Sequence, residues 1–240
     1  MIELIHPECA PTGVHVASTT RAGGVSKGVW RSLNLGRSCG DDPAAVAENR
    51  RRLQTLLPDA PHWLKQVHGT RVIRLDQWRH GIEADAVWTD QAGQVLAIQT
   101  ADCLPVLVAD REARFVAAAH AGWRGLCAGV LPRLVAALPG RAEDLWAWIG
   151  PAISQRAFEV GPEVRAAFLA AEPGFERHFA RGLVDRWLAD LKGIAAAQLQ
   201  QAGVGVISDC RLCTHSDAAR FFSYRRDGVC GRMASLIWRD

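Results

Sequence analysis

The stretch VLAIQTADCLPVLVADREARFVAAAHAG, residues 95–122, contains two long apolar runs with only Arg111 and Glu112 between them. Each run is apolar enough for a buried strand, and so short a polar break between two strands predicts a β-hairpin. Cys103 lies within the first run and His120 lies near the end of the second. A hairpin over 95–122 therefore allows these two side chains to approach each other.

Elements of both kinds flank this hairpin. Asp42 and Pro43 predict the start of a helix that runs to about residue 57, because aspartate caps helices and proline fits the first turn. Another helix is expected from about residue 124, where Pro132 would strain it. The remaining patterns predict strands over 14–19, 62–69, 71–76, 84–89, 145–150, 205–209 and 232–238, and helices over 161–171 and 184–203. This mixture favours a mixed-sheet α/β or α+β fold, and we expect one domain over residues 1–240.

The composition is typical of a soluble globular protein. Of the 240 residues, 49% are hydrophobic and 22% are charged, and the formal net charge is +3. The basic residues are scattered, which argues against nucleic acid as a partner. No run of about 18 apolar residues occurs, and the first residues lack the basic and apolar segments of an export signal, so we expect no membrane span and a cytoplasmic location. Seven cysteines, an odd number, favour reduced thiols there.

Three residues share a setting that suits metal binding. His68, near the end of the apolar stretch 62–69, joins Cys103 and His120 as a residue within or at the end of a predicted buried strand. Two imidazoles and a thiolate supply three of the four tetrahedral positions that zinc prefers, and an open fourth position is typical of a catalytic site. The residues alone leave two other interpretations open. Cys103 can be a nucleophile with His120 as its base and Asp102 as the orienting group, or all of them can be ordinary core residues.

A long loop is predicted at residues 20–36, which are too rich in glycine, serine and arginine for a regular element. Arg21 lies in this loop, and Arg124, Arg225 and Arg226 lie in other predicted loops or turns. Arginine recognises phosphate through two parallel N–H donors. These side chains are therefore candidates for contacts with a substrate phosphate.

Several motifs in the chain resemble those of the YfiH family, whose members also carry the labels laccase-domain protein, polyphenol oxidase, purine nucleoside phosphorylase and peptidoglycan editing factor. The diagnostic strings are KQVHG at 65–69, TADCLPV at 100–106 and HAGWRG at 120–125. Longer matches are TTRAGGVSKGVWRSLNLG at 19–36, IGPAISQRAFEVGPEV at 149–164 and FFSYRRDGVCGRMASLIW at 221–238. The resemblance thus spans essentially the whole chain.

The resemblance implies a single α/β domain in which mixed β-sheets pack as a sandwich with helices outside. It implies that His68, Cys103 and His120 are zinc ligands. The implied reactions are phosphorolysis of purine nucleosides (adenosine, inosine, guanosine or methylthioadenosine) to the free base and ribose 1-phosphate, and deamination of adenosine. Cys103, His120 and Asp102 are then expected at the catalytic centre. Substrate contacts are expected from three polar side chains, Arg21, Asn34 and Arg225.

Two alternative activities are compatible with the same residues. Copper can occupy a site of two histidines and one cysteine, which suits the polyphenol oxidase label. Multicopper oxidases build a trinuclear cluster from His-x-His pairs, however, and none of the eight histidines in this chain forms such a pair. Cysteine-dependent amide hydrolysis, with Cys103 as the nucleophile, suits the peptidoglycan-editing label.

Overall fold

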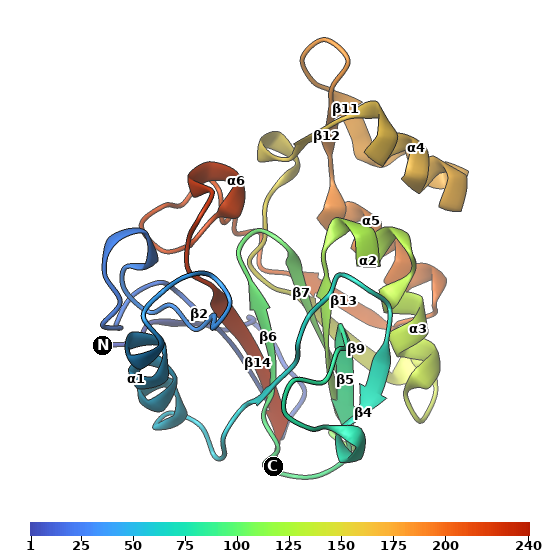
Figure 1. Ribbon diagram of the computed structural model, residues 1–240. Coiled ribbons are helices and arrows are strands. Elements are labelled where there is room, and N and C mark those ends of the chain that lie inside the picture. Colours follow the sequence, from blue (N-terminus) through green and yellow to red (C-terminus); the bar gives the residue numbers. More distant parts are fainter.

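The computed structural model describes residues 1–240 and contains two large sheets (Figure 1). The first sheet has five strands in the order β1-β2-β14-β6-β3, with β3 parallel to β6 and the other neighbours antiparallel. Its strands are β1 (Leu4–Ile5), β2 (Val14–Thr19), β14 (Met233–Arg239), β6 (Leu96–Thr100) and β3 (His62–Trp63). The last strand of the chain, β14, therefore lies in the middle of its sheet.

The second sheet has six strands in the order β13-β9-β7-β8-β5-β4. Its strands are β13 (Val206–Asp209), β9 (Leu145–Ile149), β7 (Leu104–Asp110), β8 (Val116–Ala121), β5 (Ala86–Thr89) and β4 (Val72–Arg74). The two outer pairs, β13 with β9 and β4 with β5, are parallel, and the inner pairs are antiparallel. Both large sheets are therefore mixed, as the sequence predicts.

A small third sheet and the helices complete the structure. The small sheet has the order β10-β12-β11, with β10 (Glu159–Val160), β12 (Trp187–Ala189) and β11 (Phe179–Arg181). The helices are α1 (Pro43–Gln54), α2 (Trp123–Cys127), α3 (Val130–Ala137), α4 (Pro162–Ala171), α5 (Leu191–Gln201) and α6 (Tyr224–Asp227). Short 3₁₀ turns occupy Gly28–Trp30, Leu75–Gln77, Ala142–Asp144, Gln155–Ala157 and Pro173–His178. No helix combines the length and the apolar character that crossing a membrane requires.

Three apolar clusters define the layers. One cluster joins the facing sides of the two large sheets, with Ile98 and Ile237 from the first sheet and Leu107 and Ala118 from the second. A larger cluster fills the space between the second sheet and α2, α3 and α5. A smaller one packs α1, through Leu53, on the outer side of the first sheet. Figure 1 shows α1 on one side of the sheets and α2, α3 and α5 on the other, so the predicted sandwich with external helices is confirmed.

The hairpin predicted over 95–122 is confirmed for residues 104–121 only. β7 and β8 pair antiparallel, with Leu104 opposite Ala121 and Ala109 opposite Val116. The first apolar run, predicted as one strand over 95–110, is wrong as a continuous element, because it breaks after Thr100 and its halves lie in different sheets. The break is a turn in which Asp102 has a φ of 92°, a backbone conformation outside the strand region.

Other boundaries differ for local reasons. The strands predicted over 62–69 and 71–76 are regular only at 62–63 and 72–74. The helix predicted over 184–203 begins at Leu191, because the Asp190 side chain accepts a hydrogen bond from the backbone of Gly193 and caps the helix there, while 187–189 form a strand. The helix expected from about residue 124 divides at Gly129, whose φ is 84°, and this division places Pro132 in the first turn of α3, where a missing N–H is tolerated.

Candidate metal centre

The three predicted ligands meet at one end of the six-stranded sheet. Cys103 directly precedes β7, and His120 is the next-to-last residue of β8. The antiparallel register that pairs Leu104 with Ala121 brings these positions together. His68 arrives from the segment between β3 and β4, where it has a φ of 60°.

The ligand atoms fit a tetrahedral metal. One ligand atom from each of His68, Cys103 and His120 lies within 4.8 Å of the others. Cys103 Sγ is 3.7 Å from His68 Nε2, close to the separation of about 3.6 Å that a nitrogen and a sulfur have on a tetrahedral zinc ion. The His68 and His120 rings are nearly perpendicular, at 78°, with their centroids 4.7 Å apart. His68 is exposed and His120 is buried, so the centre is open to solvent on the His68 side.

Asp85 holds the two histidines. It is fully buried directly before β5, and its Oδ1 accepts hydrogen bonds from His120 Nδ1 at 2.8 Å and from the His68 backbone N–H at 3.0 Å. Its Oδ2 accepts from the backbone N–H groups of Val67 at 3.1 Å and Gly69 at 2.8 Å. Sequence reasoning missed Asp85, because its only sequence signal is a carboxylate at the start of the apolar stretch ADAVWT.

Gly122 and Gly125, the two glycines of the HAGWRG motif, leave space for the segment that carries His68. A Cβ on Gly122 would lie 2.6 Å from His68 Cδ2 and 3.2 Å from Cys103 Sγ. A Cβ on Gly125 would lie 2.8 Å from the backbone oxygen of Gly69. The distances to His68 Cδ2 and to the Gly69 oxygen are shorter than real Cβ contacts, so any other residue at these positions would displace the His68 segment from the centre.

The charges of the centre are coupled. Burial favours a higher pKa for Cys103, but the adjacent His120 and His68 outweigh burial and lower the pKa to about 6. Burial favours a lower pKa for His120, but the Cys103 thiolate and Asp85 outweigh it and raise the pKa to about 9. Without metal, the two residues therefore form a thiolate–imidazolium pair at neutral pH, and an incoming metal ion must displace the imidazolium proton.

Asp102, the predicted catalytic carboxylate, is buried and turned into the protein. Its Oδ1 accepts a hydrogen bond from Thr214 Oγ1 at 2.7 Å. Its Oδ2 accepts from Ser223 Oγ at 2.9 Å and from the backbone N–H of Arg225 at 2.7 Å. Both oxygens are thus occupied by protein donors, and the carboxylate anchors the turn that carries Cys103. Thr214 and Ser223 carry no local sequence signal for this role.

Of the predicted substrate contacts, Arg21 and Asn34 lie in the loop at residues 20–36, whereas Arg225, predicted in a loop or turn, lies in α6. Arg225 Nη1 donates to the backbone oxygen of Glu159 at 2.6 Å, and Arg21 Nε donates to that of Arg31 at 2.8 Å. Asn34 is fully buried, and its amide is used by neighbouring protein groups, including Asp41 Oδ2 at 2.9 Å. A substrate contact by Asn34 would require these hydrogen bonds to break, and the structure instead shows it supporting the loop at residues 20–36.

Arg124, predicted in a loop or turn, lies in the first turn of α2, two residues after Gly122. Its guanidinium group stacks over the ring of Trp123 at 4.4 Å from the centroid, and its side chain is exposed with no ion pair. Its guanidinium group is therefore free to accept an anion.

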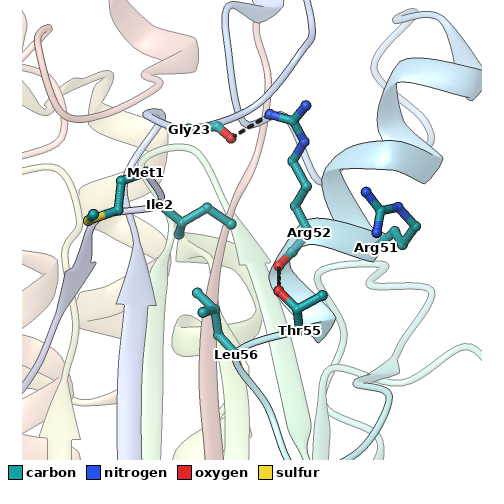
Figure 2. A pocket seen from close by; sticks show the side chains of 7 residues that line it. All are labelled: Met1, Ile2, Gly23, Arg51, Arg52, Thr55 and Leu56. Atoms are coloured by element: carbon teal, nitrogen blue, oxygen red, sulfur yellow. Dashed lines mark hydrogen bonds between the residues drawn. The ribbon is translucent and has the colours of Figure 1, made fainter.

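A cavity of about 350 Å³ lies away from these residues, between the first residues of the chain and α1 (Figure 2). Ile2 and Leu56 contribute apolar surface to it, and Arg51 and Arg52 stand at its side. Both arginines are paired with Glu48, and Arg52 also donates to the backbone oxygen of Gly23. None of the three predicted metal ligands lines this cavity.

Comparisons with known proteins agree with the motifs. The family model described as multi-copper polyphenol oxidoreductase laccase matches residues 15–240. Purine nucleoside phosphorylase YfiH of Escherichia coli is 48% identical over 242 residues, which cover 99% of both chains. A purine nucleoside phosphorylase of Pseudomonas aeruginosa is 49% identical over 230 residues and 95% of both chains.

Solved structures share the whole fold. A Neisseria meningitidis protein has a TM-score of 0.94 and 44% identity, covering 100% of this chain and 99% of its own. The YfiH protein of Bacillus licheniformis has a TM-score of 0.88 and 29% identity, covering 95% of this chain and 93% of its own. These matches show that the chain belongs to the YfiH family.

Proposed function

We propose that this chain is a zinc-dependent purine nucleoside phosphorylase that also deaminates adenosine. The observation that carries the proposal is the open three-ligand centre of His68, Cys103 and His120, whose ligand atoms lie within 4.8 Å of one another. The names of the Escherichia coli and Pseudomonas aeruginosa relatives support the purine nucleoside phosphorylase activity. The zinc ion and the deamination go beyond those names and rest on what the resemblance of the motifs implies.

Each ligand has a distinct part in this centre. Zinc bound there would supply a Lewis acid with one open position and would lower the pKa of water in that position to about 7. His120 would bind through Nε2, since its Nδ1 is engaged by Asp85. His68, the exposed ligand, lies on the side from which a nucleoside would enter.

Phosphorolysis needs a positioned phosphate and a purine that can leave. A phosphate oxygen attacks the anomeric carbon of the ribose, the glycosidic bond breaks, and the purine departs with the bonding electrons and takes up a proton. Arg124, which has no ion pair, is our candidate for the phosphate, with Arg21 and Arg225 as further candidates. We assign Asp102 a positioning role through the Cys103 turn, since both of its oxygens are occupied.

Deamination uses water instead of phosphate. Water attacks C6 of adenine and ammonia leaves, so inosine is the product. Because the anchors of Asp102 at 214–225 and the ligands at 68–120 come from distant parts of the sequence, we also propose that residues 1–240 act as one catalytic domain.

Product analysis tests this function. Adenosine is incubated with and without phosphate, using zinc-loaded wild type, Cys103→Ala and a control, Cys9→Ala, which changes an exposed cysteine. We expect adenine and ribose 1-phosphate only with phosphate, inosine in both conditions, and loss of all products in Cys103→Ala alone. Ribose 1-phosphate formation that persists in Cys103→Ala would overturn the assignment.

The geometry also favours a second candidate, cysteine-dependent amide hydrolysis. In this candidate Asp85 would orient the His120 ring, His120 would be the base and Cys103, whose pKa is about 6, would be the nucleophile. Amidase activity that survives complete metal removal, with an acyl adduct trapped on Cys103, would establish this candidate. Stoichiometric copper with oxidase turnover in protein purified without added metal would instead establish the polyphenol oxidase.

A further inference from the structure

Asp85 connects two segments of the chain that each carry a ligand of the proposed metal centre. The turn at 67–69 directs three consecutive backbone N–H groups at its carboxylate, from Val67, His68 and Gly69, at 2.8 to 3.1 Å. His120 of strand β8 makes two hydrogen bonds to Asp85. Its ring donates from Nδ1 to the carboxylate at 2.8 Å, and its backbone N–H donates to the carbonyl oxygen at 2.7 Å. No other carboxylate in the protein accepts hydrogen bonds from both of these segments.

The contact with the His120 ring fixes its tautomer. A carboxylate that is not protonated can only accept hydrogen bonds, so Nδ1 of His120 must carry the proton in this contact. The lone pair of a neutral His120 ring is then on Nε2, the nitrogen left to bind a metal together with the Cys103 thiolate. A metal-binding histidine commonly has its other ring nitrogen oriented in this way.

The contacts with the turn fix the backbone of His68. The φ of 60° at His68 is in the left-handed region, which is unfavourable for a residue other than glycine. Three N–H groups converging on one buried carboxylate offset that cost and hold the His68 ring toward Cys103. Gly122 leaves the space for the ring, since a Cβ at this position would lie 2.6 Å from His68 Cδ2.

We propose that Asp85 is a positioning residue that sets the tautomer of His120 and the turn of His68 together, so that both ligands are oriented before the metal arrives. This inference rests on the metal centre of the proposed function. An amide cannot replace the carboxylate. Asparagine at position 85 would present its NH₂ group either to the N–H groups of Val67 and Gly69, donor against donor, or to the His68 N–H and the His120 ring. The ring could accept from that NH₂ group only with its own proton on Nε2, the nitrogen that must bind the metal.

Metal affinity tests the proposal. Zinc and cobalt affinities are measured by competition with a chelator for wild type, Asp85→Asn and a matched control, Asp110→Asn. Asp110 is also a buried carboxylate of this sheet, but it lies at the other end of β7, where it binds Arg114. We expect Asp85→Asn to bind both metals about 10 to 100-fold more weakly, with a changed cobalt absorption spectrum, and Asp110→Asn to match wild type. Equal metal affinity in wild type and Asp85→Asn would overturn the proposal.

A measurement on the unchanged protein covers the case in which Asp85→Asn does not fold. In ¹⁵N-labelled, zinc-loaded wild type, NMR identifies which nitrogen of His120 carries the proton. We expect the proton on Nδ1, and a proton on Nε2 would overturn the proposal. A protein with the expected tautomer and zinc affinity but without phosphorolysis would leave this inference standing while removing the proposed function.

Discussion

Ser223 and Asp102 are 121 residues apart in the chain, yet Ser223 Oγ donates a hydrogen bond to Asp102 Oδ2 at 2.9 Å. Ser223 also caps α6 by accepting from the backbone of Arg226. One buried hydroxyl group thus joins the start of α6 to the turn that carries Cys103. The late segment of the chain is in this way attached to the metal centre without contributing a ligand to it.

Asp102→Asn should reduce stability, because its amide NH₂ would face donors that now meet a carboxylate. We expect a loss of about 1–3 kcal/mol in the free energy of unfolding, measured by urea denaturation. Thr214→Val, which removes one donor and keeps the shape of the side chain, serves as the control and should cost less than Asp102→Asn. Unchanged stability in Asp102→Asn would contradict the anchoring role.

Gly122→Ala should weaken metal binding more than it weakens the fold. The new methyl group would lie 2.6 Å from His68 Cδ2, and the His68 segment would have to move away. We expect zinc affinity to fall by about tenfold or more, as for the loss of a group that orients a ligand. Gly93→Ala is the control, because its φ of 73° should cost stability while nothing lies within 4 Å of the new methyl group. Zinc affinity equal in Gly122→Ala and Gly93→Ala would refute this close-packing argument.

The metal-free protein should be alkylated first at Cys103. Its pKa of about 6 results from His120 and His68, which outweigh the effect of burial. A pKa of about 6 leaves about nine in ten Cys103 side chains as thiolate at pH 7, compared with a few per cent for an ordinary cysteine. The rate of reaction with iodoacetamide, followed by peptide mass spectrometry, should therefore rise through pH 6 and level off above it.

Two further cysteines serve as internal standards for this experiment. Cys213, whose pKa is lowered to about 7 by hydrogen bonds from Ser154 and Ser216 that outweigh burial, should react next. Cys210, whose pKa is raised by burial, should react slowly. Zinc should protect Cys103 alone, and a Cys103 rate that still rises at pH 9 would disprove the thiolate–imidazolium pair.

Acid should remove the contribution of Asp110 to stability. The hydrogen bond from Arg114 lowers the pKa of this buried carboxyl below its ordinary value near 3.8. A group whose pKa is lower in the folded state stabilises the protein above its unfolded pKa and loses that effect as the pH falls through the folded pKa. The difference in unfolding free energy between wild type and Asp110→Asn should be largest near neutral pH and shrink below about pH 4. Urea denaturation across this pH range measures it, and a constant difference would exclude this charge effect.

Much of the fold can be predicted from the sequence, because many strands and turns are determined by residues close to one another in the chain. The β7–β8 hairpin follows from two apolar runs and a charged break, and the end of β8 at Ala121 follows from Gly122 directly after it. The strand at 187–189 was missed because Trp187 and Leu188 continue the apolar pattern of the helix that follows. Its strand character depends on pairing with 159–160 and 179–181, which no local pattern reveals.

In the candidate site, too, some residues can be predicted from the sequence and others only from the folded structure. His68, Cys103 and His120 are residue types with an intrinsic affinity for metals, so the sequence identifies them as candidates, and the structure brings them together. Asp85 acts through hydrogen bonds to neighbours 16 to 18 residues away on one side and 35 on the other, so its role depends on the folded arrangement. Asn34 is predicted as a substrate contact, and its buried amide already has protein partners on both of its polar atoms, which depends on the folded arrangement.

The central place of β14 has a consequence for a chain that is still being synthesised. β2 and β6 both pair with β14, so their facing edges stay without partners until residues 233–239 have left the ribosome. Translation adds about 5–20 residues per second, so β2 waits on the order of ten seconds or more in this state. Unpaired strand edges are where other chains attach during folding, and nascent-chain chaperones should therefore be retained on this protein until its final strand emerges.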